Sequence, residues 1–488
     1  MKKISVALVT LAALCTGLAA QDRVDFGVIE KIKAEGMERS KVLETFDYLT
    51  TVIGPRLTNS PAHKRSIAWT QEKMKAMGLT GVEAEPFQFG RGWTLNKVTI
   101  EMVEPRYMAL TGYPRGWAPS TPGRIVATPV WMPGLEDAAM KAEAGKLKGA
   151  ILFTSPIQQY AIRADRPAAS GDLKPPTPAP SRPPNLNAER HAQLKSEGVA
   201  VTIEPNIGEH GTVFVTGRDM GPNSVTSIVL ASEHYNLIAR MLEQKIPVKL
   251  AVEVQATYND EKQTHNVLGE IAGTDNALKD EVVMVGAHLD SWHTATGATD
   301  NADGAATVLE AMRILKALNI RPRRTIRAAL WAGEEQGLLG SKAWAEQHLA
   351  GDKNKGARDK FSVYFNLDNG YPPISGFYME GNEPARAIMT DWLKPLAGLG
   401  AIIPSPGHIG ATDHLSFLDV GVPGFQAVQE YINYDVRTHH TNVDFAERIE
   451  PNALKQAATV MAAVLYQAAM REGTFPKPAP PKPAGTKQ

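Results

Sequence analysis

An apolar run, Val282-Val283-Met284-Val285-Gly286-Ala287, stands between polar residues, and His288-Leu289-Asp290 follow it directly. A run of this kind is typical of a strand buried inside an α/β sheet. From residue 266 onward we expect strands and helices to alternate around it, which predicts a doubly wound mixed α/β sheet. The further strands are expected at 325–332, 361–367 and 422–428, and the helices at 301–318, 336–348, 385–396 and 452–470.

The chain before this sheet begins with a helical pattern. Residues 40–79 carry an apolar stripe at helical spacing, which we expect to be buried, and the pattern stops at Gly78. The stripe consists of Val42, Phe46, Leu49 and Val52. Residues 82–103 alternate between apolar and polar side chains, which predicts two strands around Gly90-Arg91-Gly92.

A second folding unit is expected inside the chain, because 488 residues exceed what one hydrophobic core usually holds. Residues 105–257 contain short β-like runs, at 124–127 and 149–153, and a proline-rich stretch at 166–185 that is typical of a surface loop. We therefore predict a β-rich inserted domain over 105–257. The main domain would consist of 21–104 and 258–472, followed by a disordered tail at 473–488.

The first twenty residues have the pattern of a secretory signal peptide, with a basic start, an apolar run at 4–14 and small residues before Gln21. The run is shorter than the roughly 20 residues that a helix needs to cross a bilayer, so we expect no membrane span. The only cysteine, Cys15, lies in this segment. We therefore expect an exported, periplasmic or secreted protein without thiols, which must bind any metal through His, Asp and Glu.

The charge of the chain is balanced. Lys and Arg together number 52, as do Asp and Glu, so the formal net charge is zero. A neutral chain produces no overall field that would attract nucleic acid or an anionic membrane. We therefore expect no nucleic-acid partner.

Acidic residues or histidine follow three of the predicted strands: His288 and Asp290 after the first, Glu334-Glu335 after the second, and Asp368 after the third. Because the carboxyl ends of the strands line the ligand crevice of an open α/β sheet, these side chains are expected to converge. A glycine- and aspartate-rich loop at 297–304, which contains Asp300, and the pair His439-His440 complete the set.

Each of these residues also has an explanation without a metal. Adjacent glutamates that open a helix, such as Glu334 and Glu335, are favoured there by the helix dipole. Taken together, however, so many anions packed without a cation would cost on the order of several kcal/mol in desolvation and repulsion. Mixed imidazole and carboxylate ligands favour zinc over calcium or magnesium.

Two zinc ions that share one carboxylate would account for five protein ligands and leave positions for water and substrate. Asp290, two residues beyond His288, is expected to hold the imidazole in position rather than to bind metal, because a metal-bound imidazole usually donates its other N–H to an acceptor. The alternative for Asp290 is that it only shapes its loop.

The motifs resemble those of the M28 metallopeptidases, and within them the carboxypeptidase Q-like members that carry a protease-associated (PA) domain. The resemblance covers most of the mature chain. It rests on residues 286–291 (GAHLDS), 297–304 (GATDNADG), 331–341 (WAGEEQGLLGS), 366–368 (NLD), 410–414 (GATDH) and 440–444 (HTNVD).

The resemblance implies a sheet of the zinc-exopeptidase type and a role for each site residue. His288 and His440 would bind the first zinc, Glu335 and Asp368 the second, and Asp300 both, with Glu334 as general base. The choice of His440 over its neighbour rests on its spacing to the acidic residue at 444.

One position departs from the pattern, because many similar two-zinc aminopeptidases have Tyr where this chain has His439. We hypothesise that His439 donates to the developing oxyanion in its place. The resemblance also implies that the inserted domain is a PA domain, either covering or gating the site or serving as a passive module.

The function implied is a two-zinc metallo-exopeptidase that hydrolyses short peptides, as an aminopeptidase or dipeptidase. A glutamate-type carboxypeptidase and a single-zinc glutaminyl cyclase-like transferase on the same fold stay open as alternatives. The expected partner is a peptide substrate, and a homodimer stays open.

Overall fold

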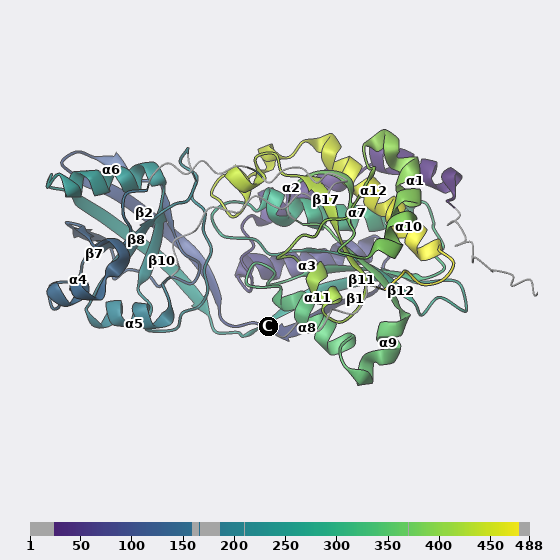
Figure 1. The fold of residues 1–488 in the computed structure, drawn as a ribbon, viewed down its shortest axis with the longest axis horizontal. Coiled ribbons are helices and arrows are strands. Elements are labelled where there is room, and N and C mark those ends of the chain that lie inside the picture. The colour runs from purple at the N-terminus through teal and green to yellow at the C-terminus, as the bar shows by residue number, and fades with distance from the viewer. Residues whose placement is uncertain (1–23, 159–164, 166–185, 209, 369, 478–488) are drawn as a thin grey trace, which may run out of the picture.

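The computed structural model describes residues 24–158, 165, 186–208, 210–368 and 370–477. An eight-stranded sheet forms its larger part, in the order β1-β11-β13-β12-β14-β17-β15-β16 (Figure 1). At its centre β12 (Val282–His288) lies parallel to β13 (Thr325–Trp331) on one side and to β14 (Phe361–Asn366) on the other, and β17 (Gly424–Glu430) continues parallel to β14. The predicted α/β class and these four strands are confirmed.

Antiparallel pairs at both edges make the sheet mixed, as predicted. On one side β11 (Gln263–Ile271) pairs antiparallel with β13 and with β1 (Thr80–Gln88). On the other side β15 (Tyr371–Tyr378) runs antiparallel to β17, and β16 (Ile403–Ser405) closes the edge parallel to β15.

Alternate residues of each strand point to opposite sides of the sheet. Since both sets are apolar in the central strands, helices cover both faces. Val283 and Val285 of β12 share one core with α7 (Asp303–Ala317) and α12 (Pro451–Met470), whereas Met284 packs on the other face with Trp344 of α8 (Leu339–His348). The first face also holds α1 (Phe26–Glu38), α2 (Val42–Asp47), α3 (Pro61–Ala76) and α10 (Glu383–Leu393), and the second holds α11 (His414–Leu418); α9 (Lys355–Lys360) leads into β14.

One expectation for the helical start is wrong. Val42, Phe46 and Leu49 are buried as predicted, but Val52 is 61% exposed. The backbone forms a π-helix over Tyr48–Ile53, directly after α2. Because the wider π-helical turn breaks the 3.6-residue period, Val52 turns away from the stripe that its spacing predicted.

The second body, here called the β-rich lobe, runs from β2 (Gly92–Glu104) to β10 (Lys249–Asn259) and is drawn to the left in Figure 1. It has a four-stranded sheet, β3-β2-β10-β5, and a five-stranded sheet, β4-β9-β8-β7-β6, around a hydrophobic core of its own. Its shorter strands are β3 (Met108–Ala109), β4 (Gly112–Pro114), β5 (Ile125–Ala127), β6 (Val130–Trp131), β7 (Ile151–Phe153), β8 (Val201–Pro205) and β9 (Thr226–Leu230), and its helices are α4 (Asp137–Ala142), α5 (Ala188–Ser196) and α6 (Ser232–Glu243).

The two strands predicted around Gly90-Arg91-Gly92 exist, but they belong to different sheets. β1 pairs with β11 in the large sheet, and β2 pairs with β10 in the lobe. The lobe therefore begins earlier than predicted, because its first strand, β2, ends where the boundary was expected, after residue 104. The boundary predicted at 257 lies within β10.

Three predictions concern the ends and the loop of the chain. The signal peptide and the proline-rich stretch at 166–185 lie outside the described residues. The tail was expected to be disordered from residue 473, but Phe475 is buried against Trp392 and Phe425, so the packed chain continues at least to that residue. Among the helices that the structure describes, none is long and apolar enough to cross a membrane.

Candidate metal centre

The order of the central strands brings the predicted residues together. His288 is the last residue of β12, Glu334 and Glu335 come shortly after β13, and Asp368 comes shortly after β14. Since β13 and β14 flank β12 in parallel, all of these residues leave the sheet at the same edge. The residues that the sequence singled out therefore lie together at one edge of the sheet.

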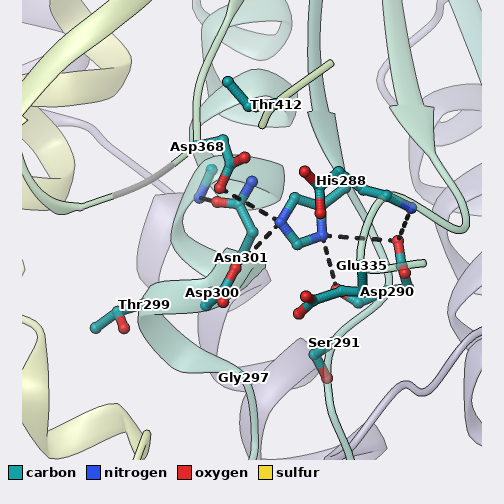
Figure 2. A network of polar contacts seen from close by, with 12 residues as sticks. His288, Asp290, Ser291, Gly297, Thr299, Asp300, Asn301, Glu335, Asp368 and Thr412 are labelled. Carbon is teal, nitrogen blue, oxygen red and sulfur yellow. Dashed lines mark hydrogen bonds and ion pairs between the residues drawn. The ribbon is translucent and has the colours of Figure 1, made fainter. Parts of the chain in front are cut away.

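His288 is fully buried between acidic groups (Figure 2). Its Nε2 lies 3.2 Å from Asp300 Oδ1 and 3.4 Å from Asp368 Oδ1. On the other side of the ring, Nδ1 lies 3.0 Å from the main-chain carbonyl oxygen of Asp290 and 3.6 Å from its carboxylate. Nδ1 can donate to Asp290 while Nε2 faces the carboxylates.

The carboxylate of Asp290 is itself held in place. Its Oδ2 accepts a hydrogen bond from Thr58 Oγ1 at 2.6 Å, and its Oδ1 accepts one from the main-chain N–H of Glu334 at 3.4 Å. Asp290 therefore connects the end of β12 to the turn that carries Glu334 and Glu335.

His440 reaches the site from the loop after β17. Its Nε2 lies 2.8 Å from Glu335 Oε2 and 3.3 Å from Asp300 Oδ2. His439 lies next to it, with its ring stacked on Tyr434 at 5.0 Å between centroids and a ring nitrogen within 4.8 Å of the ligand atoms of Asp300 and His440.

The structure pairs the candidate ligands differently from the sharing that the resemblance implied. We expected His288 and His440 to bind the same ion; in the structure His288 Nε2 lies 3.4 Å from Asp368 Oδ1, and His440 Nε2 lies 2.8 Å from Glu335 Oε2. The strand order explains this, because β14 and β13 lie on opposite sides of β12 and their terminal carboxylates are separated accordingly.

Asp300 lies between the two pairs, with one carboxylate oxygen toward each imidazole. Asp444 holds this segment, since its carboxylate accepts hydrogen bonds from the N–H groups of Thr299, at 2.8 Å, and Asp300, at 3.2 Å. Gly297 begins the loop at a φ of +60°, and a Cβ there would lie 2.4 Å from Ser291 Cβ, so the loop requires glycine.

The electrostatics of the site call for a cation. Burial raises the pKa of Glu334 and that of Glu335 well above the usual range, and neighbouring carboxylates add to this effect. Burial alone would lower the pKa of His288, but Asp368 and Glu334 outweigh it, so the His288 pKa is raised. The buried atoms Asp300 Oδ2 and Glu335 Oε1 accept no hydrogen bond from any described group.

These observations fit a divalent metal. Two imidazoles and three carboxylates supply nitrogen and oxygen ligands. The two oxygens without a hydrogen bond, Asp300 Oδ2 and Glu335 Oε1, belong to carboxylates that contact His440, and a cation there would neutralise them. One ion would be held by His288, Asp368 and Asp300, and the other by His440, Glu335 and Asp300.

Arg56, which the sequence did not single out, supports the segment after His288 and the loop that carries Asp300. Its guanidinium is fully buried and donates to five main-chain carbonyls, those of Leu49, Gly54, Leu289, Thr296 and Gly297, at 2.7–3.3 Å. Leu289 directly follows His288, and Gly297 opens the loop with Asp300. Burial lowers the pKa of Arg56 to about 10.

Two further buried acids near the site, Asp413 and Asp444, entered the sequence analysis only as part of a motif or for spacing. Burial raises the pKa of Asp413 to about 7 and that of Asp444 to about 7. Asp413 accepts a hydrogen bond from Ser341 Oγ at 2.5 Å. The 410–414 motif pointed to Asp413, whereas no pattern around Arg56 indicated that its side chain would be buried.

Comparisons with known proteins identify related chains. Residues 266–465 match Peptidase family M28. Carboxypeptidase Q from Homo sapiens is 25% identical over 493 residues, which cover 96% of this chain and 98% of that protein. The crystal structure of a peptidase M28 precursor from Shewanella amazonensis is similar at a TM-score of 0.71 and 26% identity, covering 94% of this chain and 99% of that one. A zinc aminopeptidase from Bacillus subtilis has the same fold at a TM-score of 0.61 and 20% identity, covering 90% and 97%.

Proposed function

Because the chain belongs to peptidase family M28, we propose that it is an exported zinc metallo-exopeptidase that hydrolyses short peptides. In this proposal it binds two zinc ions at the edge of the large sheet. The observation that carries this proposal is the position of Asp300 between the His288–Asp368 pair and the His440–Glu335 pair. A shared carboxylate between two such pairs suits two divalent ions better than one.

One zinc would be held by His288, Asp368 and Asp300, and the other by His440, Glu335 and Asp300. Each set has one imidazole and two carboxylates, which leaves coordination positions for water and substrate. Asp290 keeps Nδ1 of His288 occupied as a donor, so that Nε2 is the nitrogen presented to the metal.

When bound, the zinc ions supply Lewis acidity that polarises the peptide carbonyl and makes water a better proton donor at neutral pH. Glu334 is the general base that takes this proton and later gives it to the leaving amine. Its position supports the role, since a carboxylate oxygen of Glu334 lies within 4.8 Å of the ligand atoms of His288 and Asp368. Its main chain is fixed by Asp290.

His439 is assigned the contact to the developing oxyanion. Its ring stacks on Tyr434, and a ring nitrogen lies within 4.8 Å of the ligand atoms of His440 and Asp300, which supports this role. A hydrogen bond from an N–H donor at this position to the reacting oxygen would be stronger in the transition state than in the substrate complex.

Export and the nature of the lobe complete the proposal. The signal-peptide pattern of the first twenty residues supports export to the periplasm or the medium. The β-rich lobe is assigned as a PA domain on the motif resemblance described above.

The direction of cleavage is the open choice between two activities. The free α-amine of a substrate would be attracted by the carboxylates around the metals, which favours an aminopeptidase or dipeptidase. The similarity to carboxypeptidase Q over nearly the whole chain favours the second candidate, a carboxypeptidase.

A substrate panel separates these activities. The zinc-loaded protein is incubated with a free dipeptide, its N-acetylated form and its C-amidated form. We expect N-acetylation to abolish cleavage; C-amidation should leave cleavage intact for an aminopeptidase and abolish it for a dipeptidase. Cleavage that survives N-acetylation and is lost on C-amidation would establish the carboxypeptidase. A single-zinc transferase would hold one zinc per chain and cleave none of the three.

A further inference from the structure

We infer that the β-rich lobe is part of the metal centre, because its segment 213–215 holds the backbone of His440 in place. This inference rests on the proposed two-zinc site and makes Phe214 and Asn442 positioning residues for the zinc beside Glu335.

A short antiparallel bridge joins the lobe to the His440 loop, residues 433–442. Phe214 pairs with Thr441, and the N–H of Val215 donates to the carbonyl oxygen of His440 at 2.9 Å. The N–H of Val213 donates to Asn442 Oδ1 at 2.6 Å. The metal-binding loop is thus hydrogen-bonded at His440 and at Asn442 to a segment far away in the sequence.

The side chains of the bridging segment divide between the two bodies. Val213 and Val215 are fully buried in a core cluster of the lobe, together with Val229. Phe214 points the other way, and its ring centroid lies 5.1 Å from that of His440 and 5.9 Å from that of His439. Because alternate residues of an extended segment face opposite sides, the valines anchor the segment while Phe214 supports the histidines.

Asn206 of the lobe also holds segment 213–215 in place. Asn206 Oδ1 accepts a hydrogen bond from the N–H of Phe214 at 2.7 Å, and its amide group donates to the carbonyl oxygen of Thr212 at 2.5 Å. Asn206 is buried directly after β8. The support for His440 therefore traces back to the sheet of the lobe.

His440 has a backbone conformation that needs such support. Its φ is +58°, a left-handed value that is uncommon for a residue with a side chain. Residues in this region persist where the surroundings fix them. The Val215 N–H donates to the carbonyl of His440, and the Phe214 ring lies against its imidazole. The lobe therefore fixes both the backbone and the side chain of His440.

The arrangement predicts that damage to the bridge affects one ion and not the other. In the proposed arrangement His440 and Glu335 hold one zinc, whereas the positions of His288 and Asp368 are set by β12 and β14. Phe214→Ala removes the ring behind His440, and Asn442→Ala removes the acceptor for Val213.

The test measures both zinc dissociation constants by chelator competition in the full-length protein. For Phe214→Ala and for Asn442→Ala we expect one constant, that of the ion held by His440 and Glu335, to rise about 10- to 100-fold, with the other constant unchanged. Phe214→Leu, which keeps an apolar contact, should lose less. Tyr107→Ala is the matched control, since it truncates an exposed aromatic residue of the same lobe and should change neither constant.

The outcomes separate this inference from the proposed function. A wild-type protein that binds fewer than two zinc ions contradicts the two-zinc site itself. If wild type binds two and both bridge variants keep both constants, the lobe does not support the metal centre and the inference is wrong. A melting temperature of the apo protein that falls while both constants stay unchanged has the same meaning, because it reports a purely structural role.

Discussion

His440 Nε2 lies 2.8 Å from Glu335 Oε2, although His440 comes from the loop after β17 and Glu335 from the turn after β13. On the other side of Asp300, His288 faces Asp368. Each imidazole thus has a carboxylate partner of its own, and Asp300 has one oxygen for each. This division leads to predictions that treat the two zinc ions separately.

The first prediction concerns which residues share an ion. Glu335→Gln and His440→Ala should each reduce the zinc content from two to one per chain, and the double variant should still hold one, because both residues serve the same ion. A combined Asp368→Asn and His440→Ala variant should retain none. Zinc content after gel filtration measures this, and a Glu335/His440 double variant without zinc would contradict the pairing.

The adjacent glutamates should give different defects. Glu334→Gln removes the general base, so we expect kcat to fall by about 10³-fold with both zinc ions retained, within the range for general acid–base groups. Glu335→Gln is the matched control, since it should lose zinc as well as activity. Turnover of Glu334→Gln near the wild-type rate would exclude the assignment.

His439 should affect turnover more than substrate binding. If His439 donates to the oxyanion, His439→Ala lowers kcat by about 10²-fold while KM changes little, because the contact forms in the transition state. Steady-state kinetics on a free dipeptide measure both constants. An unchanged kcat would leave His439 without a role in the reaction.

Arg56 should be needed for metal affinity as well as for stability. Lysine has three donors on one nitrogen and cannot reproduce five hydrogen bonds, so Arg56→Lys should destabilise the fold by about 3 kcal/mol. It should also weaken zinc binding, because Arg56 ties the loops of His288 and Asp300.

A second fully buried arginine provides the control for this prediction. Arg324 donates to the carboxylate of Glu281 at 2.7 Å and to the carbonyl oxygen of Gly473 at 2.8 Å, so its hydrogen bonds hold a different part of the chain from those of Arg56. Arg324→Lys should lower the free energy of unfolding, measured in urea, without changing the zinc dissociation constants. Equal zinc affinity in both variants would show that Arg56 has no special link to the site.

Acid should destabilise the junction between the large sheet and the lobe through His293. Burial lowers the pKa of His293 from 6.5 to about 4, and its Nε2 lies 2.9 Å from the carbonyl oxygen of Pro114 in β4. Between these two pH values the unfolded chain binds a proton that the folded chain does not, so stability is complete above pH 6.5 and falls as the pH drops toward 4.

The size of this effect follows from the shift in pKa. It amounts to about 3 kcal/mol between pH 6.5 and 4. His293→Gln can still donate to Pro114 but cannot take up a proton, so its free energy of unfolding should fall less over this range. Parallel pH dependences of the two proteins would contradict the prediction.

Much of the fold could be predicted from strand and helix patterns. The apolar runs that became β12, β13, β14 and β17 are buried on both faces, which makes them visible in the sequence. The site residues at their ends followed from the same reasoning, because the carboxyl end of a parallel strand fixes where the next residues lie.

Tertiary context decided the remainder. β1 and β2 are separated only by residues 89–91 but join different sheets, and local alternation carries no information on the partner strand. The sharing of ligands between the ions depends on strand order, which the sequence does not display. Arg56 is an arginine in a short segment between helices, and its burial results from the carbonyls that surround it.

The most direct test of the two-zinc centre is anomalous diffraction at the zinc edge from crystals of the zinc-loaded protein. We expect two peaks, one bound by His288 and Asp368 and the other by His440 and Glu335, with Asp300 contacting both. A single peak, or two peaks with His288 and His440 on the same ion, would contradict the account.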